Sequence, residues 1–236
     1  MIDLTSFERD GVALVFGASG GVGAALCHEI EMSGHFAHLC AMSRRSSPSF
    51  DLTDQESIRH AVEHAAAQGP LRLVIDATGF LHDDQQGPEK SLRDLDAAKL
   101  ARSFALNAIG PALIMKHVLP ILPAQGKSLF ATLSARVGSI GDNHLGGWYG
   151  YRASKAALNQ LMRTAAIELR RRRPQAICVS LHPGTVQSDL SSPFAKDGLE
   201  VQTPQQSAQS LLGVMNALNV SQTGGFFDHH GKPIVW

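Results

Sequence analysis

The chain alternates short apolar runs with longer segments in which apolar positions recur at helical spacing. The apolar runs predict strands over 12–16, 36–42, 71–77, 128–133 and 177–181, and the longer segments predict helices from about 21 and 54 and over 97–118, 151–172 and 204–218. Parallel strands need helix-length crossovers, and such crossovers are right-handed. The pattern therefore predicts an α/β fold: a doubly wound parallel sheet of Rossmann type with helices on both faces.

One stretch interrupts this rhythm. Residues 188–203 are polar and contain two Pro-bounded pieces without periodicity, so we expect a mobile flap over a site. The chain has no internal repeat and no low-complexity tract. We expect a single domain over 1–236, with a cofactor half over about 1–125 and a catalytic and substrate half over about 126–236.

Composition narrows the possible partners. Hydrophobic residues make up 44% of the 236 positions and charged residues 18%, with a mean hydropathy of -0.04, which excludes a disordered chain. The 21 basic and 21 acidic residues cancel, so no net field attracts nucleic acid or an anionic membrane, and we expect neither as a partner. The basic run 170–173 suits the negative end of a helix dipole. Nucleic-acid binding by this run is the alternative, and it predicts strongly salt-dependent affinity.

Cysteine usage and the opening residues bear on location. The three cysteines are widely spaced in apolar stretches and favour free thiols in a reducing compartment. The first residues lack a basic segment followed by an apolar run, and no stretch approaches the roughly 18 apolar residues that span a bilayer. We expect a soluble, cytoplasmic protein. The cluster Asp228-His229-His230 lacks a further spaced ligand, so we expect no metal site.

The first predicted strand leads directly into a glycine-rich loop that opens a helix, Gly17-Ala18-Ser19-Gly20-Gly21-Val22-Gly23. Glycine at 17, 21 and 23 permits a tight turn, close approach of the backbone to a pyrophosphate and close packing of helix on strand. The free N–H groups and partial positive charge of a helix N-terminus suit a diphosphate. A plain turn is the alternative, which the position after a strand disfavours.

The end of the second predicted strand indicates which dinucleotide binds. Met42-Ser43-Arg44-Arg45 lacks the carboxylate that holds the adenosine ribose in NAD(H) sites. A hydroxyl and a guanidinium fork suit a 2′-phosphate, which a carboxylate would repel. The sequence therefore predicts NADP(H), held by Ser43 and Arg44, with an exposed solvated loop as the alternative. Asp51 and Leu52 are candidates for the adenine pocket.

Tyr151 and Lys155 carry the candidate chemistry, because four-residue spacing places both on one face of a predicted helix. A tyrosine titrates near 10, so acid/base work near neutral pH requires a stabilisation of the phenolate by about 4 kcal/mol. An ammonium about 4 Å away, at an effective dielectric of about 20, supplies about that much. We predict that Tyr151 is the acid/base and Lys155 its activator; an ordinary surface pair is the alternative.

Six motifs then occur in a family's order along nearly the whole chain: Gly17-x3-Gly21-x-Gly23, Asp51-Leu52, Asp76-Ala77-Thr78-Gly79, Asn107-Ala108-Ile109-Gly110, Tyr151-x3-Lys155 and Pro183-Gly184. On these the chain resembles the short-chain dehydrogenase/reductase family. The segments 134–140 and 146–159 are similar to the C-factor and sniffer-type carbonyl reductase branch.

The resemblance implies further roles. Tyr151 would exchange a proton with substrate, Lys155 would also bind the nicotinamide ribose, and Asn107 would hold a water in a proton relay. The remaining implied cofactor contacts are Ser19, Val22, Ala77, Thr78, Gly79, Pro183, the Val186 backbone and the Ser188 hydroxyl. The family's paired asparagines are absent from 76–79, and we expect Thr78 to compensate only partly. The resemblance also implies a homodimer or homotetramer built on the long helices.

One departure concerns the carbonyl-polarising serine of the family, whose place is taken by Ala135. Ser134 lies one position away, which in a strand turns a side chain to the opposite face, so it serves only if the strand has ended or bulged. Ser139 is the other candidate, and we favour Ser134. Without either hydroxyl the developing alkoxide loses a donor, at a cost of about 3–4 kcal/mol.

The sequence thus predicts NADP(H)-dependent interconversion of a small-molecule carbonyl and alcohol by Tyr–Lys chemistry. Trp148 and Phe194 are candidates to line the substrate pocket. The alternative is an NADPH-binding signalling or scaffold protein with little catalysis, which Ala135 and the likeness to C-factor proteins motivate.

Overall fold

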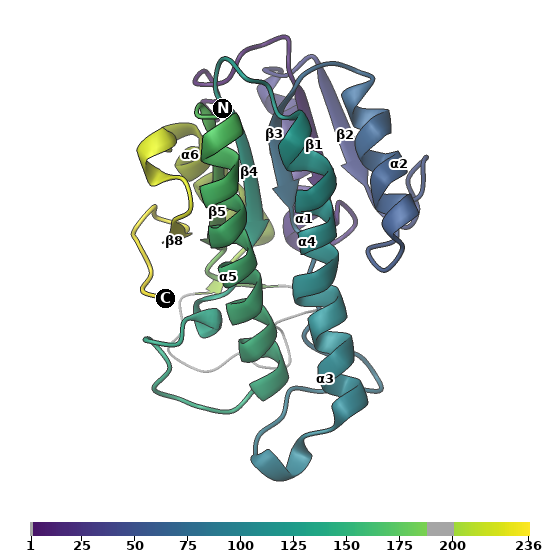
Figure 1. Ribbon diagram of the computed structural model, residues 1–236, viewed down its shortest axis with the longest axis vertical. Helices are drawn as coiled ribbons and strands as arrows, with labels where there is room; N and C mark the ends of the chain where they lie inside the picture. The colour runs from purple at the N-terminus through teal and green to yellow at the C-terminus, as the bar shows by residue number, and fades with distance from the viewer. Residues whose placement is uncertain (1, 188–200) are drawn as a thin grey trace.

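The central sheet of the computed structural model, which describes residues 2–187 and 201–236, has six parallel strands in the order β2-β1-β3-β4-β5-β8 (Figure 1). The strands are β1 (Val12–Phe16), β2 (His38–Met42), β3 (Leu71–Asp76), β4 (Ser128–Leu133), β5 (Ala176–His182) and β8 (Phe226–Asp228). The predicted doubly wound α/β fold is confirmed.

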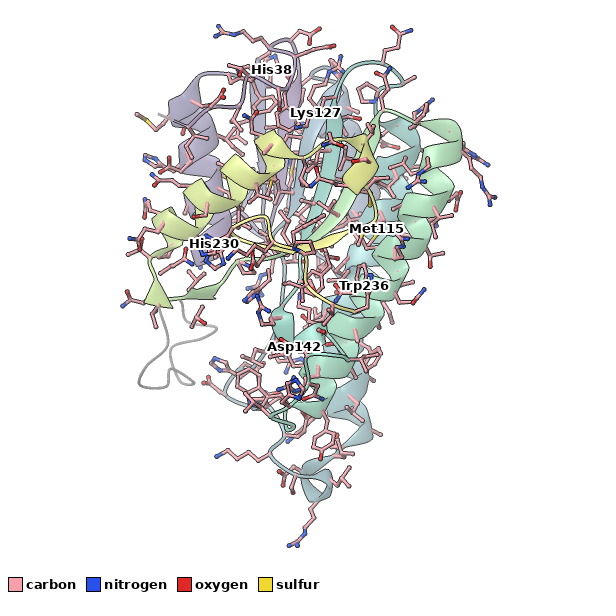
Figure 2. All side chains as sticks on the ribbon, turned by 90° about the vertical axis from the view of Figure 1, so that its left-hand side faces the viewer. His38, Met115, Lys127, Asp142, His230 and Trp236 are labelled. Atoms are coloured by element: carbon pink, nitrogen blue, oxygen red, sulfur yellow. The ribbon has the colours of Figure 1, made fainter. Side chains whose placement is uncertain are left out.

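Helices cover both faces of the sheet. One face packs against α2 (Gln55–Ala66), α4 (Gly110–Val118) and α5 (Tyr149–Arg172), and the other against α1 (Gly21–Ser33) and α6 (Pro204–Ala217). Strand β1 alternates between the two cores, with Leu14 on the α5 side and Val15 on the α1 side. Figure 2 shows the sheet between the two layers, with His38 and Lys127 marking the end at which β2 and β4 begin.

The strand order creates a crevice at the carboxyl ends of β1 and β3. After β1 the chain moves outward to β2 and then returns to place β3 on the other side of β1. Open α/β sheets bind ligands at such a switch point. The loops there are fixed by backbone bonds, since the amide N of Gly17 lies 3.0 Å from the Met42 oxygen and that of Ala77 lies 3.0 Å from the Phe16 oxygen.

The helix predicted over 97–118 is interrupted. It consists of α3 (Ala97–Phe104), a π-helical turn (Ala105–Ile109) and α4. The predicted helical segment is present, and the π turn within it was not anticipated, because the apolar pattern tolerates the one extra residue of such a turn. Such turns often occur at functional sites, and this one contains Asn107.

The helical segment Ala97–Ile121 is also more apolar than expected. By length and composition alone its 25 residues could cross a membrane, contrary to the expectation that no stretch approaches this length. The core helix of a soluble protein passes the same test, and 44% of its most apolar window is buried inside the protein. In Figure 1 this segment runs beside α5.

Three short strands were not predicted. Strand β8 has three residues, and β6 (Thr185–Val186) and β7 (Val201–Gln202) have two each, lengths at which periodicity gives no signal. The flap expected over 188–203 falls mostly outside the described residues. Within this stretch, Val201 and Gln202 form β7, which pairs with β6, and α6 begins at Pro204.

Candidate active site

The glycine-rich loop is built around two close approaches. Gly17 has a φ of 78°, and a Cβ there would lie 2.8 Å from the Ala77 backbone oxygen. A Cβ on Gly23 would lie 2.2 Å from the Gly17 oxygen, so only glycine lets α1 pack against the loop. No such contact involves Gly20, whose Cβ would meet its nearest atom at 3.4 Å. The glycines at 17 and 23 therefore hold the loop tightly against the end of β3.

This loop leaves the amino end of α1 free to bind an anion. The helix begins at Gly21, its N-cap Gly20 supplies no side-chain bond, and its first turn carries no acidic residue. The first N–H groups of a helix have no acceptor within the helix. Ser19 is exposed beside them, and Val22 is half-buried. The arrangement fits the diphosphate of a dinucleotide.

Ser43 and Arg44 lie at the carboxyl end of β2, which is the edge strand. The Ser43 hydroxyl accepts a hydrogen bond from the Arg45 amide at 3.1 Å, and the Ser43 carbonyl accepts one from Phe50 at 2.8 Å. Arg44 is exposed, so its guanidinium is accessible. The turn therefore offers one hydroxyl and one accessible cation beyond the end of β2.

Asp51 and Leu52 have structural partners. The Asp51 carboxylate accepts hydrogen bonds from the Thr53 amide at 2.8 Å and from the Thr53 hydroxyl at 2.7 Å. These bonds hold the pKa of Asp51 below its usual value, and the charge of Arg44 makes a smaller contribution. Leu52 packs on α4, where a Cβ on Gly110 would lie 2.5 Å from its Cγ. Both residues thus fix the loop between β2 and α2.

The end of β3 is joined to β4 by a buried polar network. Asp76 accepts hydrogen bonds from the Thr78 amide at 3.0 Å and hydroxyl at 2.5 Å through Oδ1, and from the Thr132 hydroxyl at 2.7 Å through Oδ2. The expectation that Thr78 compensates only partly for the missing asparagines overlooked Thr132. Together these three side chains link the two strands. Gly79 follows, and a Cβ there would lie 3.7 Å from Lys155 Nζ and 3.9 Å from Asn107 Oδ1.

Asn107 is fully buried in the π-helical turn. Its Oδ1 accepts from the Phe80 amide at 2.8 Å, and its Nδ2 donates to the Phe80 oxygen at 2.8 Å and to Ser154 Oγ at 3.1 Å. Ser154 in turn donates to the Tyr151 oxygen at 2.9 Å. Asn107 therefore ties the loop after β3 to the first turns of α5.

Tyr151 and Lys155 share one face of α5, as their spacing predicts. Lys155 is 2% exposed, its Nζ donates to the Leu133 oxygen at 2.8 Å, and Nζ lies 6.0 Å from the centroid of the Tyr151 ring. Trp148 packs edge-on against Tyr151, with 6.2 Å between ring centroids. The pair thus sits where α5 meets the ends of β3 and β4.

The protonation of this pair differs from the sequence-based expectation. Burial raises the pKa of Tyr151 to about 12, whereas a depressed value was predicted. Burial also lowers the pKa of Lys155 to about 8, and the charge of Asp76 opposes that shift. The predicted depression considered the ammonium alone and left out the burial of the phenol, which is what raises the pKa of Tyr151. Tyr151 is accordingly protonated at neutral pH.

The two candidate serines differ in their partners. Strand β4 ends at Leu133, yet the Ser134 amide still bonds to the Leu181 oxygen at 2.8 Å. Ser134 is 3% exposed, and among the described residues its Oγ has no hydrogen-bond partner. Ser139 is equally buried, but its Oγ accepts from the Asp142 amide at 3.1 Å. Ser128 in β4 and Ser180 in β5 also have buried hydroxyls without a partner among the described residues, so the unpaired hydroxyl makes Ser134 a candidate donor and does not by itself assign it.

Glu89 was missed by sequence analysis and fixes the start of α5. The helix follows Trp148, which has a φ of 53°, and no local side chain caps it. Glu89 accepts from the Trp148 amide at 2.5 Å through its backbone oxygen and from the Gly150 amide at 3.0 Å through Oε2. A carboxylate at the amino end of a helix is favourable. The two segments are 61 residues apart, so no local motif could reveal the pairing.

The loop after β5 is fixed from two sides. Ser207 of α6 donates to the Pro183 oxygen at 2.8 Å, and Val186 lies in β6, which pairs with β7. Gly184 has a φ of 82°, and a Cβ there would lie 3.1 Å from the His229 ring. Ser188 and Phe194, predicted to contact cofactor and substrate, lie outside the described residues. Within the described ranges no three His, Cys, Asp or Glu residues gather to hold a metal.

The model of the short chain dehydrogenase family matches residues 11–198. The chain is 36% identical over 169 residues to C-signal of Myxococcus xanthus, covering 71% of this chain and 94% of that protein. Among solved structures it resembles an NADPH-bound carbonyl reductase from chicken fatty liver, with a TM-score of 0.85, 24% identity and coverage of 100% and 96%. It also resembles the carbonyl reductase Sniffer of D. melanogaster, with a TM-score of 0.82, 22% identity and coverage of 97% and 100%.

These likenesses agree with the geometry. The glycine loop at the switch point, the Tyr151–Lys155 pair on α5 and the polar groups at the ends of β3 and β4 lie along one edge of the sheet. The family match extends over that whole arrangement. The chain belongs to the short-chain dehydrogenase/reductase family of oxidoreductases, with its likeness to the sniffer and carbonyl reductase branch.

Proposed function

We propose that the protein is an NADP(H)-dependent oxidoreductase that interconverts a small-molecule carbonyl and its alcohol. The observation that carries the proposal is the buried face of α5, where Tyr151 and Lys155 adjoin Asn107 and the ends of β3 and β4. A carbonyl reductase and Sniffer share this fold, and the former was solved with NADPH bound.

Proton transfer is the work of Tyr151. With a pKa near 12 the phenol is protonated at neutral pH, so it is ready to donate its proton to the carbonyl oxygen during reduction. The phenolate that remains is stabilised by the Lys155 ammonium. In the oxidative direction the phenolate accepts the hydroxyl proton, so we expect oxidation to accelerate as pH rises.

The dinucleotide, when bound, would supply the hydride for the carbonyl carbon. The amino end of α1 over 21–23, with Ser19, would hold its diphosphate, and Ser43 and Arg44 would hold the 2′-phosphate. The other proposed contacts are Asp51, Leu52, Ala77, Thr78, Gly79, Lys155, Pro183, Val186 and Ser188. Ser134, whose hydroxyl has no partner among the described residues, would donate to the substrate oxygen.

A signalling or scaffold role with little catalysis is the second candidate. It is favoured by the similarity to C-signal and by Ala135 at the usual position of the polarising serine. The burial of Lys155 close to Tyr151 favours catalysis, because burying an ammonium costs free energy and a protein that only binds its ligand has no need of it.

The experiment is NADPH consumption by purified protein with a panel of small aldehydes and ketones. We expect turnover, and we expect Tyr151→Phe to reduce kcat by about 10²–10⁴-fold while NADPH affinity, measured by fluorescence, is retained. Tyr149→Phe, at the half-buried first residue of α5, is the control. Turnover of Tyr151→Phe at the wild-type rate would remove Tyr151 from this role, and tight NADPH binding without turnover would favour the signalling candidate.

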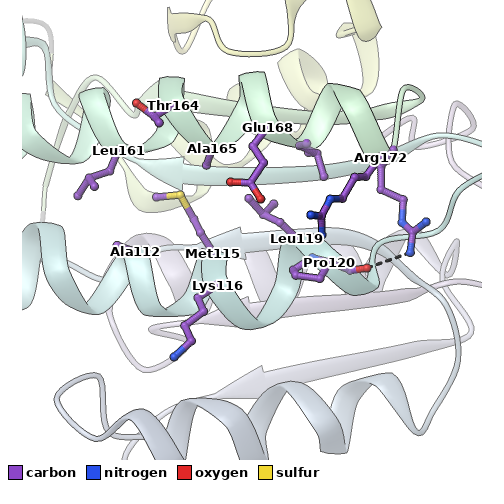
Figure 3. Close-up of a pocket in the computed structure, with 12 residues that line it drawn as sticks. Ala112, Met115, Lys116, Leu119, Pro120, Leu161, Thr164, Ala165, Glu168 and Arg172 are labelled. Atoms are coloured by element: carbon purple, nitrogen blue, oxygen red, sulfur yellow. Dashed lines mark hydrogen bonds between the residues drawn. The ribbon is translucent and has the colours of Figure 1, made fainter.

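We also propose self-association through a groove of about 530 Å³ between α4 and α5 (Figure 3). Its apolar lining includes Met115 and Leu161, and Leu161 is 40% exposed. Glu168 and Arg172 line the same groove, so a two-fold axis could pair each with the opposite charge on a second copy. This accounts for the apolar character of the helical segment that contains α4.

Light scattering tests the association. We expect a homodimer or homotetramer, and we expect Leu161→Asp to dissociate it, while Val220→Asp, an exposed apolar position outside the groove, leaves the mass unchanged. A monomeric wild-type protein would contradict this proposal.

The three cysteines are free, and Cys40 and Cys178 are buried. Free thiols suit a reducing compartment, and we propose the cytoplasm as the location of the protein.

A further inference from the structure

Asp76 is a buried carboxyl group that the mechanism above does not use. It ends β3, is 0% exposed and accepts three hydrogen bonds on its two oxygens, from the Thr78 amide, the Thr78 hydroxyl and the Thr132 hydroxyl. Hydrogen bonds donated to a carboxyl group favour its ionised form. Burial raises the pKa of Asp76, and these three hydrogen bonds, together with the charge of Lys155, oppose that shift.

Lys155 reaches the same place from α5. Its Nζ donates to the oxygen of Leu133, the residue after Thr132 on β4, and Thr132 is the register partner of Asp76. A Cβ on Gly79, three residues after Asp76, would lie 3.7 Å from Nζ. A buried cation and a buried carboxyl group thus share the ends of two adjacent strands.

We propose that Asp76 is ionised and is the counter-ion of Lys155, and that it keeps the ammonium charged at the pH at which the enzyme works. The inference rests on the function proposed above, since it concerns the activator of Tyr151. Asp76 is not itself a proposed contact of substrate or cofactor, although it accepts two hydrogen bonds from Thr78, which is a proposed cofactor contact. It is a positioning residue that acts through Lys155.

The charges around Lys155 support this assignment. The titratable groups that face it are Asp76 from β3 and Tyr151 from its own helix, and β4 faces it with a backbone carbonyl. Burial lowers the pKa of Lys155 to about 8, and Asp76 is the group that raises it. An opposite charge within about 4–6 Å changes a pKa by about 1–3 units. Without Asp76 the ammonium would lose its proton at a lower pH.

Asp76→Asn is the test, because it removes the charge, keeps the size of the side chain and keeps one accepting oxygen for Thr78, while the new amide can donate to the Thr132 hydroxyl. We expect the alkaline limb of the pH profile for carbonyl reduction to move down by about one unit or more. Asp228→Asn is the matched control: Asp228 is 6% exposed, ends β8, accepts from His230, Lys232 and Arg136, and should leave the limb in place. An unmoved limb in Asp76→Asn would overturn the proposal.

A second measurement needs no activity, so it separates this proposal from the proposed function. Urea unfolding of Asp76→Asn, Lys155→Met and the double variant forms a double-mutant cycle. We expect the double variant to be more stable than the two single losses added together, because it leaves no unpaired buried charge. Additive losses would contradict the proposed coupling between the two charges.

Should Asp76→Asn not fold, Thr132→Val takes its place in the pH profile. It removes one of the three donors to the carboxylate, so the alkaline limb should again move down, by less. A limb that stays in place, in a variant with normal NADPH binding, would equally overturn the assignment.

Discussion

The cofactor end of the site consists mainly of backbone groups, and the catalytic end consists mainly of buried polar side chains. At the cofactor end the chain offers backbone: a glycine loop in close contact with the end of β3 and a helix terminus without a side-chain cap. At the catalytic end it offers buried side chains, with Lys155, Asp76 and Asn107 each 2% exposed or less. A backbone site tolerates changes of side chain but no added Cβ, while a side-chain site depends on every polar atom in it.

After the loss expected for Tyr151→Phe, the largest expected effect is at the catalytic end, where the substrate oxygen would bind. Ser134→Ala removes the hydroxyl that has no partner among the described residues, and we expect kcat to fall by about 10²–10³-fold with little change in NADPH affinity. Ser139→Ala is the control, because that hydroxyl already accepts from Asp142. A larger loss in Ser139→Ala, measured in steady-state kinetics, would make Ser139 the polarising group and contradict our preference.

The second expected effect is weaker NADPH binding at the cofactor end. Gly23→Ala places a methyl group 2.2 Å from the Gly17 oxygen, and we expect the displaced loop to weaken NADPH binding by about 10²-fold and to destabilise the fold by about 1–3 kcal/mol. The matched variant is Gly213→Ala in α6, where an added Cβ meets nothing within 4 Å. It should stabilise the protein by about 0.5–1 kcal/mol in thermal unfolding, since alanine favours helix. Normal NADPH titration of Gly23→Ala would show that the close approach is dispensable.

The smallest expected effect concerns Arg44, the charged side chain that we propose to bind cofactor at an end otherwise formed mainly by backbone. Arg44→Ala should weaken NADPH binding by about tenfold and leave NADH binding nearly unchanged, since only the former carries the 2′-phosphate. Arg45→Ala is the control for loss of one exposed charge. Equal weakening of both dinucleotides, measured by fluorescence titration, would indicate a general electrostatic effect and not recognition of the phosphate.

What the sequence could predict follows from the distance between partners along the chain. Strand β1, the glycine loop and the shared helix face of Tyr151 and Lys155 depend on local spacing, and the structure agrees with each. The link from Thr132 to Asp76 joins residues 56 apart, and only the fold brings them together. The predicted direction of the Tyr151 pKa shift was wrong for the same reason, because burial, which raises that pKa, is a property of the packed molecule.

The interrupted helix shows a second limit. Apolar positions continue through 97–118 without a break, so the pattern predicts a regular helix, while the π-helical turn changes which face of the helix presents Asn107. Strand β8 was missed because three residues have no periodicity, and its pairing with β5 is set by the sheet already present.

The cap on α5 has a consequence for how the enzyme is assembled. Glu89 reaches Gly150 only after 61 residues of chain have been closed into a loop, and no nearer side chain starts that helix. We therefore expect the first turn of α5 to order late in folding and to open first under mild denaturant, so that activity disappears before the sheet unravels.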